Sequence, residues 1–169
     1  MFNPDKPNNL IQLEASELHT YWHLVRPGLE YMVSEGRNPD GWLPEDIYMA
    51  LKSSSATLFF TSIMRERAKG LKYATREAAI ADSSGFVVLQ KTNDYKHAAL
   101  HIWIAVSNDT TNKSNAGSIM RVFNEELNDV AKNIGCTAIT FGSNQDWWDD
   151  IAPRFDFSKL ETRWRKEVK

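Results

Sequence analysis

The sequence predicts an α/β (α+β) fold, in which the strands and helices of one domain alternate along 169 residues. Apolar residues recur at spacings of three and four over residues 18–32, which is the period of a helix. Residues 98–106 instead alternate between two kinds of side chain, which is the period of a strand. In the second half of the chain a strand, a polar loop, a helix, a strand, a short helix and a last strand are expected in that order.

The composition indicates a well-packed globular domain. Hydrophobic residues make up 42% of the chain and aromatic residues 11%, including six tryptophans. A chain of roughly 150 residues buries about 70% of the surface that its unfolded form exposes, so one core suffices. The 20 basic and 22 acidic residues leave a net charge of −2, which makes nucleic acid an unlikely partner. Basic residues do gather between Arg65 and Arg76; a solvated charge run is the usual explanation of such a stretch, and a phosphate-bearing partner is the alternative.

The cysteine content and the hydropathy indicate the cellular compartment that we expect for this protein. Cys136 is the single cysteine, which excludes an intramolecular disulfide framework and a cysteine-rich zinc site. No metal site is expected. No segment approaches the roughly 18 apolar residues of a membrane span, and the first residues lack the apolar core of a signal peptide. The sequence therefore predicts a cytoplasmic protein without a membrane span.

In the first third of the chain we expect an arm, a short strand and a helix. Residues 1–9, rich in proline and asparagine, predict a flexible or extended N-terminal arm, and residues 10–169 predict a single domain. A short strand is expected at 10–13 and a helix at 18–32. Pro27-Gly28 interrupts that helical stripe, so either the helix kinks there or two helices meet.

The middle of the chain predicts a loop, a helix and a strand. Residues 36–42 are a loop by composition, and Pro44 with two following acids is typical of a helix start. This helix should run to about residue 53, and a strand should span 56–64. No element is assigned to the charged stretch 65–77, and a turn is expected at 82–85.

Two strands, 86–90 and 98–106, should form an antiparallel hairpin. In the second strand the alternation predicts two faces. One holds Leu100, Ile102, Ile104 and Val106, and the other holds His101, Trp103 and Ala105.

The remaining elements complete the predicted domain. After a polar loop at 108–118, a helix carries an apolar stripe and ends at Gly135, a natural left-handed cap. A buried strand is expected at 137–141, a short helix at 146–153 and a last strand at 160–168, whose residues alternate between packed and solvated positions. The helical stripe comprises Ile119, Val122, Phe123, Val130 and Ile134.

A polar loop that opens a helix is a candidate anion site. Unpaired backbone N–H groups at a helix start, together with the helix dipole, favour a phosphate or pyrophosphate. The site would span Asn115 to Ile119, with Lys113 as a supporting charge. An ordinary solvated connection with Ser118 as N-cap accounts for the same residues equally well.

This order of elements resembles the GNAT superfamily of acyl-CoA-dependent N-acyltransferases, over roughly Leu10 to the last residue. The family's loop pattern is Arg/Gln-x-x-Gly-x-Gly/Ala, and its backbone amides hold the pyrophosphate of coenzyme A. The best match here is Lys113-Ser114-Asn115-Ala116-Gly117-Ser118, which replaces the arginine and the first and last small residues. The resemblance implies a mixed, mostly antiparallel sheet flanked by helices. It also implies acetyl-CoA as cofactor, bound by Val106, Asn108, Lys113, Asn115, Ala116, Gly117 and Ser118.

The resemblance also implies candidate catalytic residues. An amine held between the fourth and fifth strands would attack the thioester carbonyl, polarised by a backbone amide near Val106 to Asn108. His101 or a water would remove a proton, and Asn144 would orient the pantetheine arm or the substrate. The position of the family's tyrosine falls near Ile151 or Ala152 here, so the usual acid for the departing thiolate is absent, and the fourth strand lacks the family's glutamate. A histidine simply packed beside Trp103 is the competing interpretation of His101.

Two function classes therefore stay open. One is an acyl-CoA-binding N-acetyltransferase acting on a small amine or a protein amine. The other is a catalytically degenerate structural or interaction protein. Residues 148–166 resemble small GNAT-like proteins of tailed bacteriophages, which would make other virion subunits the partners and place the protein in the host cytoplasm or the virion.

Overall fold

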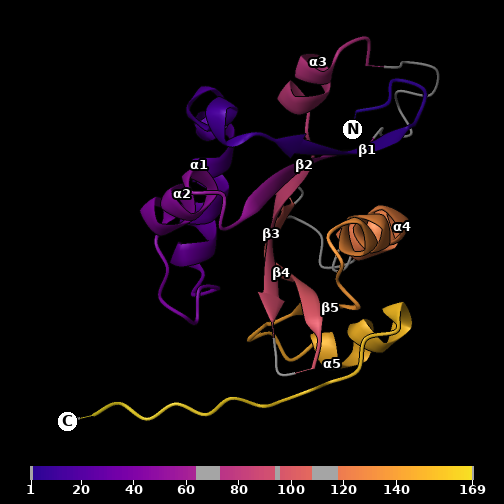
Figure 1. Ribbon diagram of the computed structural model, residues 1–169. Helices are drawn as coiled ribbons and strands as arrows, with labels where there is room; N and C mark the ends of the chain where they lie inside the picture. The colour runs from indigo at the N-terminus through magenta and orange to yellow at the C-terminus, as the bar shows by residue number, and fades with distance from the viewer. Residues whose placement is uncertain (1, 64–72, 94–95, 108–117, 169) are drawn as a thin grey trace.

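The computed structural model describes residues 2–63, 73–93, 96–107 and 118–168, and within them five strands form one sheet (Figure 1). The strands are β1 (Asn8–Leu13), β2 (Thr57–Ile63), β3 (Gly85–Asn93), β4 (Ala98–Ser107) and β5 (Ala138–Phe141). They lie in the order β1-β2-β3-β4-β5; the first four are antiparallel and β5 runs parallel to β4. The mixed, mostly antiparallel sheet and the predicted hairpin are confirmed.

Helices cover both faces of this sheet (Figure 1). One face carries α1 (Leu18–Ser34), which follows the 3₁₀ helix η1 (Ala15–Glu17), and α2 (Pro44–Lys52). The other face carries α4 (Ser118–Asn133). The short α3 (Arg76–Ala81), α5 (Trp148–Ile151) and 3₁₀ helix η4 (Ala152–Phe155) complete the fold. In the part of the chain that the structure describes, no helix has the length and apolar character needed to cross a membrane.

Each face of the sheet has its own core. The side under α1 and α2 fully buries Ile11, Leu18, Leu29, Ile47, Leu58, Phe60, Ile80, Phe86 and Ile104. The side under α4 fully buries Leu100, Phe123 and Leu127. Successive side chains of β3 point to opposite faces of the sheet. Phe86 and Val88 therefore pack in the core under α1 and α2, and Val87 and Leu89 pack in the core under α4.

The predicted single apolar face of β4 is wrong, because a β-bulge interrupts the strand. Val88 of β3 lies opposite Ile104, but Leu89 lies opposite Ile102, so Trp103 is an extra residue. Leu100 and Ile102 consequently pack toward α4, whereas Ile104 and Val106 pack toward α1 and α2. His101 and Ala105, predicted on one face, therefore lie on opposite faces.

Pro27-Gly28 marks a close contact rather than a break, since α1 is one helix with Pro27 inside it. A Cβ on Gly28 would lie 2.9 Å from Cγ1 of Val106 and 3.1 Å from Cε1 of Phe86. Glycine at this position therefore lets α1 approach β3 and β4 just beyond the bulge.

Two further expectations about the second half are wrong. The strand expected to be buried, β5, is an edge strand with an exposed Ala138 and three half-buried residues, because only β4 pairs with it among the described residues. Ile134 lies beyond the end of α4 and is 39% exposed, although Gly135 does adopt the left-handed conformation expected of a cap.

The expected last strand is absent from the described residues. Residues 158–168 carry no regular structure and leave the domain as an extended segment, and Figure 1 shows them in yellow. Alternation predicted a strand here, but alternation alone supplies no partner strand.

Most of the unassigned stretch 65–77 lies outside the described residues. Its last part contains the start of α3, where Thr75 caps the helix by accepting a hydrogen bond from the Ala78 N–H. Arg76 binds both carboxylate oxygens of Glu17 at 2.8 and 2.9 Å, so this basic residue is engaged within the chain. The arginine lowers the pKa of the Glu17 carboxyl.

The predicted N-terminal arm makes contacts with the domain. Phe2 packs against the core under α1 and α2, and the Asn3 backbone N–H donates to Oδ1 of Asn9 at 2.8 Å. The division at residue 10 stays a prediction.

We predict that Gly85→Ala strongly destabilises the protein. A Cβ at Gly85 would lie 1.9 Å from the carbonyl oxygen of Val106, and the backbone there has φ +156°. Strain and overpacking together should cost about 3 kcal/mol, measured by chemical denaturation. Gly142→Ala is the matched control, since a Cβ there meets nothing within 4 Å. A Gly85→Ala protein as stable as this control would contradict the strand geometry.

Candidate functional site

The pairing of the parallel strands β4 and β5 ends directly before the bulge, because β5 itself ends at Phe141. Their pairing runs from Ala99 and Ala138 to Ile102 and Phe141, whereas β4 continues to Ser107 beside β3. Bulges locally disrupt pairing and bend the strand that carries them. Within the part of β4 beyond this pairing, Ala105 is exposed on the side of α4, while its neighbours Ile104 and Val106 are buried on the other side. Among the described residues, β5 does not pair with residues 103–106 of β4, and the exposed Ala105 offers access there from the side of α4.

His101 lies beside the last paired residues of β4 and β5. Its side chain points to the face that α1 and α2 cover, where Nδ1 lies 2.9 Å from Oγ1 of Thr140 on β5. Burial lowers the pKa of His101, and the negative charge of Asp40 opposes that shift in part. The imidazole is accordingly neutral at pH 7, which is the form that accepts a proton.

The connection between α1 and α2 reaches this same place. It turns through Gly36 and Gly41, both with positive φ, and it is anchored by the buried Trp42. Nδ2 of Asn144, just beyond β5, donates to the Gly36 carbonyl at 3.0 Å. The connection also carries Asp40, whose negative charge raises the pKa of His101 and so opposes the effect of burial. The hydrogen bonds of His101 to Thr140 and of Asn144 to Gly36 thus place a neutral base and an amide around β5 and its end.

The structure describes only some of the candidate residues. His101 and Asn144 both lie around β5, and Val106 packs its side chain into the core under α1 and α2. Ser118 is the first residue of α4. The other cofactor candidates, Asn108, Lys113, Asn115, Ala116 and Gly117, lie outside the described residues.

Sequence reasoning missed Thr140 and Asp40. Thr140 contacts His101 only because β4 and β5 pair with these two residues opposite each other. The local sequence does not indicate this register. Asp40 stands in Asn-Pro-Asp-Gly, which predicts a turn and carries no sign of its distant neighbour.

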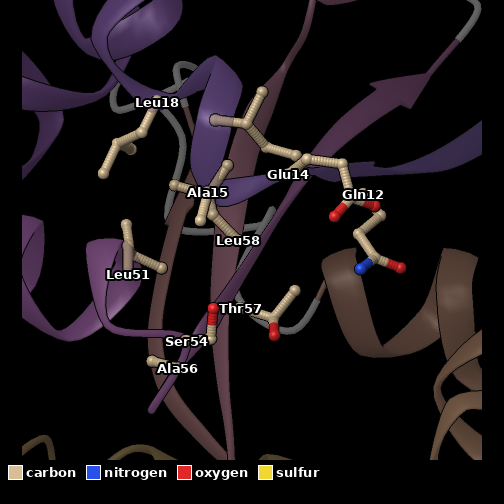
Figure 2. A pocket seen from close by; sticks show the side chains of 10 residues that line it. Gln12, Glu14, Ala15, Leu18, Leu51, Ser54, Ala56, Thr57 and Leu58 are labelled. Carbon is tan, nitrogen blue, oxygen red and sulfur yellow. The ribbon is translucent and has the colours of Figure 1, made fainter.

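A separate pocket lies at the opposite edge of the sheet. It has a volume of about 160 Å³ and sits between β1, η1 and the turn that joins α2 to β2 (Figure 2). Its lining mixes apolar side chains such as Leu18 and Leu51 with polar ones such as Gln12 and Ser54. None of the candidate residues lines it.

The fold is similar to that of known acetyltransferases. An aminoglycoside N-acetyltransferase in complex with CoA superposes with a TM-score of 0.57 at 12% identity, over 96% of this chain and 95% of that chain. Glucosamine-6-phosphate N-acetyltransferase from Arabidopsis thaliana gives 0.55 at 12% identity, over 97% and 100%. Ribosomal-protein-alanine N-acetyltransferase from Brucella melitensis gives 0.55 at 11% identity, over 96% and 99%.

These likenesses establish a GNAT-like fold and confirm that part of the resemblance. No protein-family model matches the sequence, and no curated protein matches it. The comparisons give no support to a phage origin or to a place in a virion.

We predict that His101 titrates below its ordinary pKa of 6.5 and that Asp40→Asn lowers the value further, because Asp40 favours the charged imidazolium. NMR titration of the imidazole resonances measures both, with His101→Gln to assign the signal. Asp129→Asn, on the exposed side of α4, should leave the value unchanged.

The same pKa shift predicts how stability depends on pH. A histidine whose pKa is lowered by folding contributes stability above pH 6.5 that is lost as the pH falls. A pKa at or above 6.5 for His101 would contradict its burial.

Proposed function

We propose that this protein is an acetyl-CoA-dependent N-acetyltransferase that acetylates an amine. The carrying observation is the stretch of β4 beyond the bulge that β5 does not reach, with a neutral, half-buried His101 beside the last paired residues. The similarity of the fold to several N-acetyltransferases supports the assignment.

The cofactor site would lie on the side of α4. The exposed Ala105 leaves that side of β4 open, and the backbone from Val106 to Asn108 would polarise the thioester carbonyl. Asn115 to Ser118 would hold the pyrophosphate at the start of α4, with Lys113 as a supporting charge. When bound, acetyl-CoA supplies the acetyl group and carries away the electron pair of the broken carbon–sulfur bond as a thiolate.

His101 would accept the proton that the amine loses. We assign the tautomer in which Nδ1–H donates to Thr140 Oγ1, because this leaves the lone pair on Nε2. Thr140 is then a positioning residue that orients the ring. The lowered pKa keeps Nε2 unprotonated at neutral pH and therefore able to act as a base.

The acceptor amine would approach from the connection between α1 and α2. Asp40 lies there, 3.4 Å from the guanidinium of Arg163, and would attract a cationic amine that takes the place of this arginine before the amine loses its proton. Asn144 holds Gly36 of this connection in place, so it would shape the acceptor side as well as contact the substrate or the pantetheine arm.

Calorimetric titration of acetyl-CoA tests the cofactor site. We expect micromolar binding by the natural chain and its loss in Gly117→Asp, because the new carboxylate would repel the pyrophosphate. Ser54→Asp adds the same charge at the opposite edge of the sheet and should bind like the natural chain. No binding by the natural chain would refute the proposal and favour a structural role for the fold. Equal binding by both variants would refute the assignment of this loop.

Turnover with a panel of amines tests the base. His101→Gln should lower kcat about 10²-fold or more at pH 7 with little change in the affinity for acetyl-CoA. His19→Gln, on the exposed side of α1, is the matched control and should turn over normally. If His101→Gln keeps full activity, His101 is a packed residue and a water removes the proton.

A further inference from the structure

The segment 158–168 extends from the end of η4 toward the connection between α1 and α2, and ion pairs hold it at two points. Nζ of Lys159 lies 3.1 Å from both carboxylate oxygens of Asp149 on α5. Further along, Nη1 of Arg163 lies 3.4 Å from Oδ1 of Asp40. Figure 1 shows the segment in yellow, running below the sheet. The segment therefore reaches the side from which the acceptor amine would approach.

Charge, and not apolar packing, keeps the segment in this position. Leu160 is 80% exposed, Trp164 is 92% exposed and Val168 is 97% exposed, so these side chains add little to either core. The segment carries four basic residues against two acidic ones. Ion pairs between exposed side chains are weak, because water and salt screen them. The segment can therefore leave Asp40 without exposing a core residue.

The carboxylate of Asp40 has two uses that compete with each other. Its charge acts on the imidazole of His101, so Asp40 belongs to the surroundings of the proposed base. The same carboxylate is paired with the guanidinium of Arg163. A cationic acceptor that also paired with Asp40 would lie beside a second positive charge, and like charges repel each other at this range. Arg163 therefore stands where the positive charge of an acceptor would stand.

The covalent connection favours Arg163 over a free cation. Residue 163 follows the anchored Lys159 by four positions, so its side chain stays close to Asp40 even when the pair opens. A group held by a short flexible tether has an effective concentration in about the millimolar range. A free acceptor must compete with this local concentration, although the ion pair itself is weak.

We propose that residues 158–168 are an internal competitor of the acceptor, in which Arg163 occupies the place of the acceptor's positive charge on Asp40. This inference rests on the acetyltransferase function proposed above and concerns the regulation of that site. The segment leaves Asp40 when a cationic amine binds there and returns when the product departs. The apparent affinity for the amine is reduced by the fraction of molecules in which Arg163 holds Asp40.

Steady-state kinetics of the full chain test the competition. The measurement uses low salt, saturating acetyl-CoA and the aliphatic amine that turns over fastest in the panel described above. We expect Arg163→Gln to lower the KM for this amine about two- to fivefold with an unchanged kcat, because one exposed ion pair no longer has to open. The difference from the natural chain should vanish at about 1 M salt, where charges are screened within about 3 Å.

Two variants of the same segment serve as controls. Arg165→Gln removes the same charge, but from an ion pair with Glu167 at 3.0 Å inside the segment, and should keep the natural KM. Arg163→Lys retains a cation that can pair with Asp40 and should also keep a KM close to the natural value.

NMR titration of His101 reports the contact without any turnover. Arg163→Gln should raise the pKa of His101, because the Asp40 carboxylate then acts on the imidazole without a guanidinium beside it. In an Asp40→Asn background the same substitution should leave the pKa of His101 nearly unchanged, since the coupling passes through Asp40.

The outcomes separate this proposal from the proposed function. No turnover in the natural chain or in any variant would refute the acetyltransferase function, and the competition with it. Turnover with equal KM values for the natural chain and Arg163→Gln would refute the competition alone. An equal fall in KM for Arg165→Gln would also overturn it, because the effect would then come from the overall charge of the segment. An unchanged pKa of His101 in Arg163→Gln would refute the contact itself.

Discussion

The β-bulge at Trp103 is the constraint on which the rest of the structure depends. One extra residue in β4 reverses the alternation of its side chains, so Leu100 and Ile102 serve the core under α4 and Ile104 and Val106 serve the core under α1 and α2. The pairing of β4 with β5 also ends directly before the bulge. The neighbouring glycines fit this geometry, because Gly28 admits α1 against Val106 and Gly85 admits the Val106 carbonyl. Core packing and the fit of these glycines thus share one physical cause.

The surroundings of His101 show how distant segments produce one chemical environment. Thr140 on β5 holds one ring nitrogen, burial favours the neutral ring, and Asp40 opposes that preference from the connection between α1 and α2. Asn144 ties this connection to the end of β5. A neutral histidine beside an acidic loop suits the removal of a proton from an amine, which is the step that acetyl transfer requires.

The two edge strands of the sheet, β1 and β5, differ in what lies beside them. At β1 the short helix η1 lies beside the edge, and Arg76 ties it to α3 through Glu17. At β5 no further strand pairs with the edge among the described residues, and Leu160, Trp164 and Val168 of the extended segment 158–168 are exposed.

Sequence by itself determined the elements whose signals are local. The apolar period of α1, the proline and acids that start α2, the strand-forming residues of β3 and β4 and the glycine that follows α4 all act within a few residues, and each element lies close to where these signals place it. The order of elements was enough to indicate the acetyltransferase fold. Tertiary structure alone decided the bulge at Trp103, the hydrogen bond of His101 to Thr140, the effect of the Asp40 charge on His101, the half-burial of β5 and the missing strand at 160–168. These depend on which segments meet across the sheet, and a strand forms only where a partner edge accepts its hydrogen bonds.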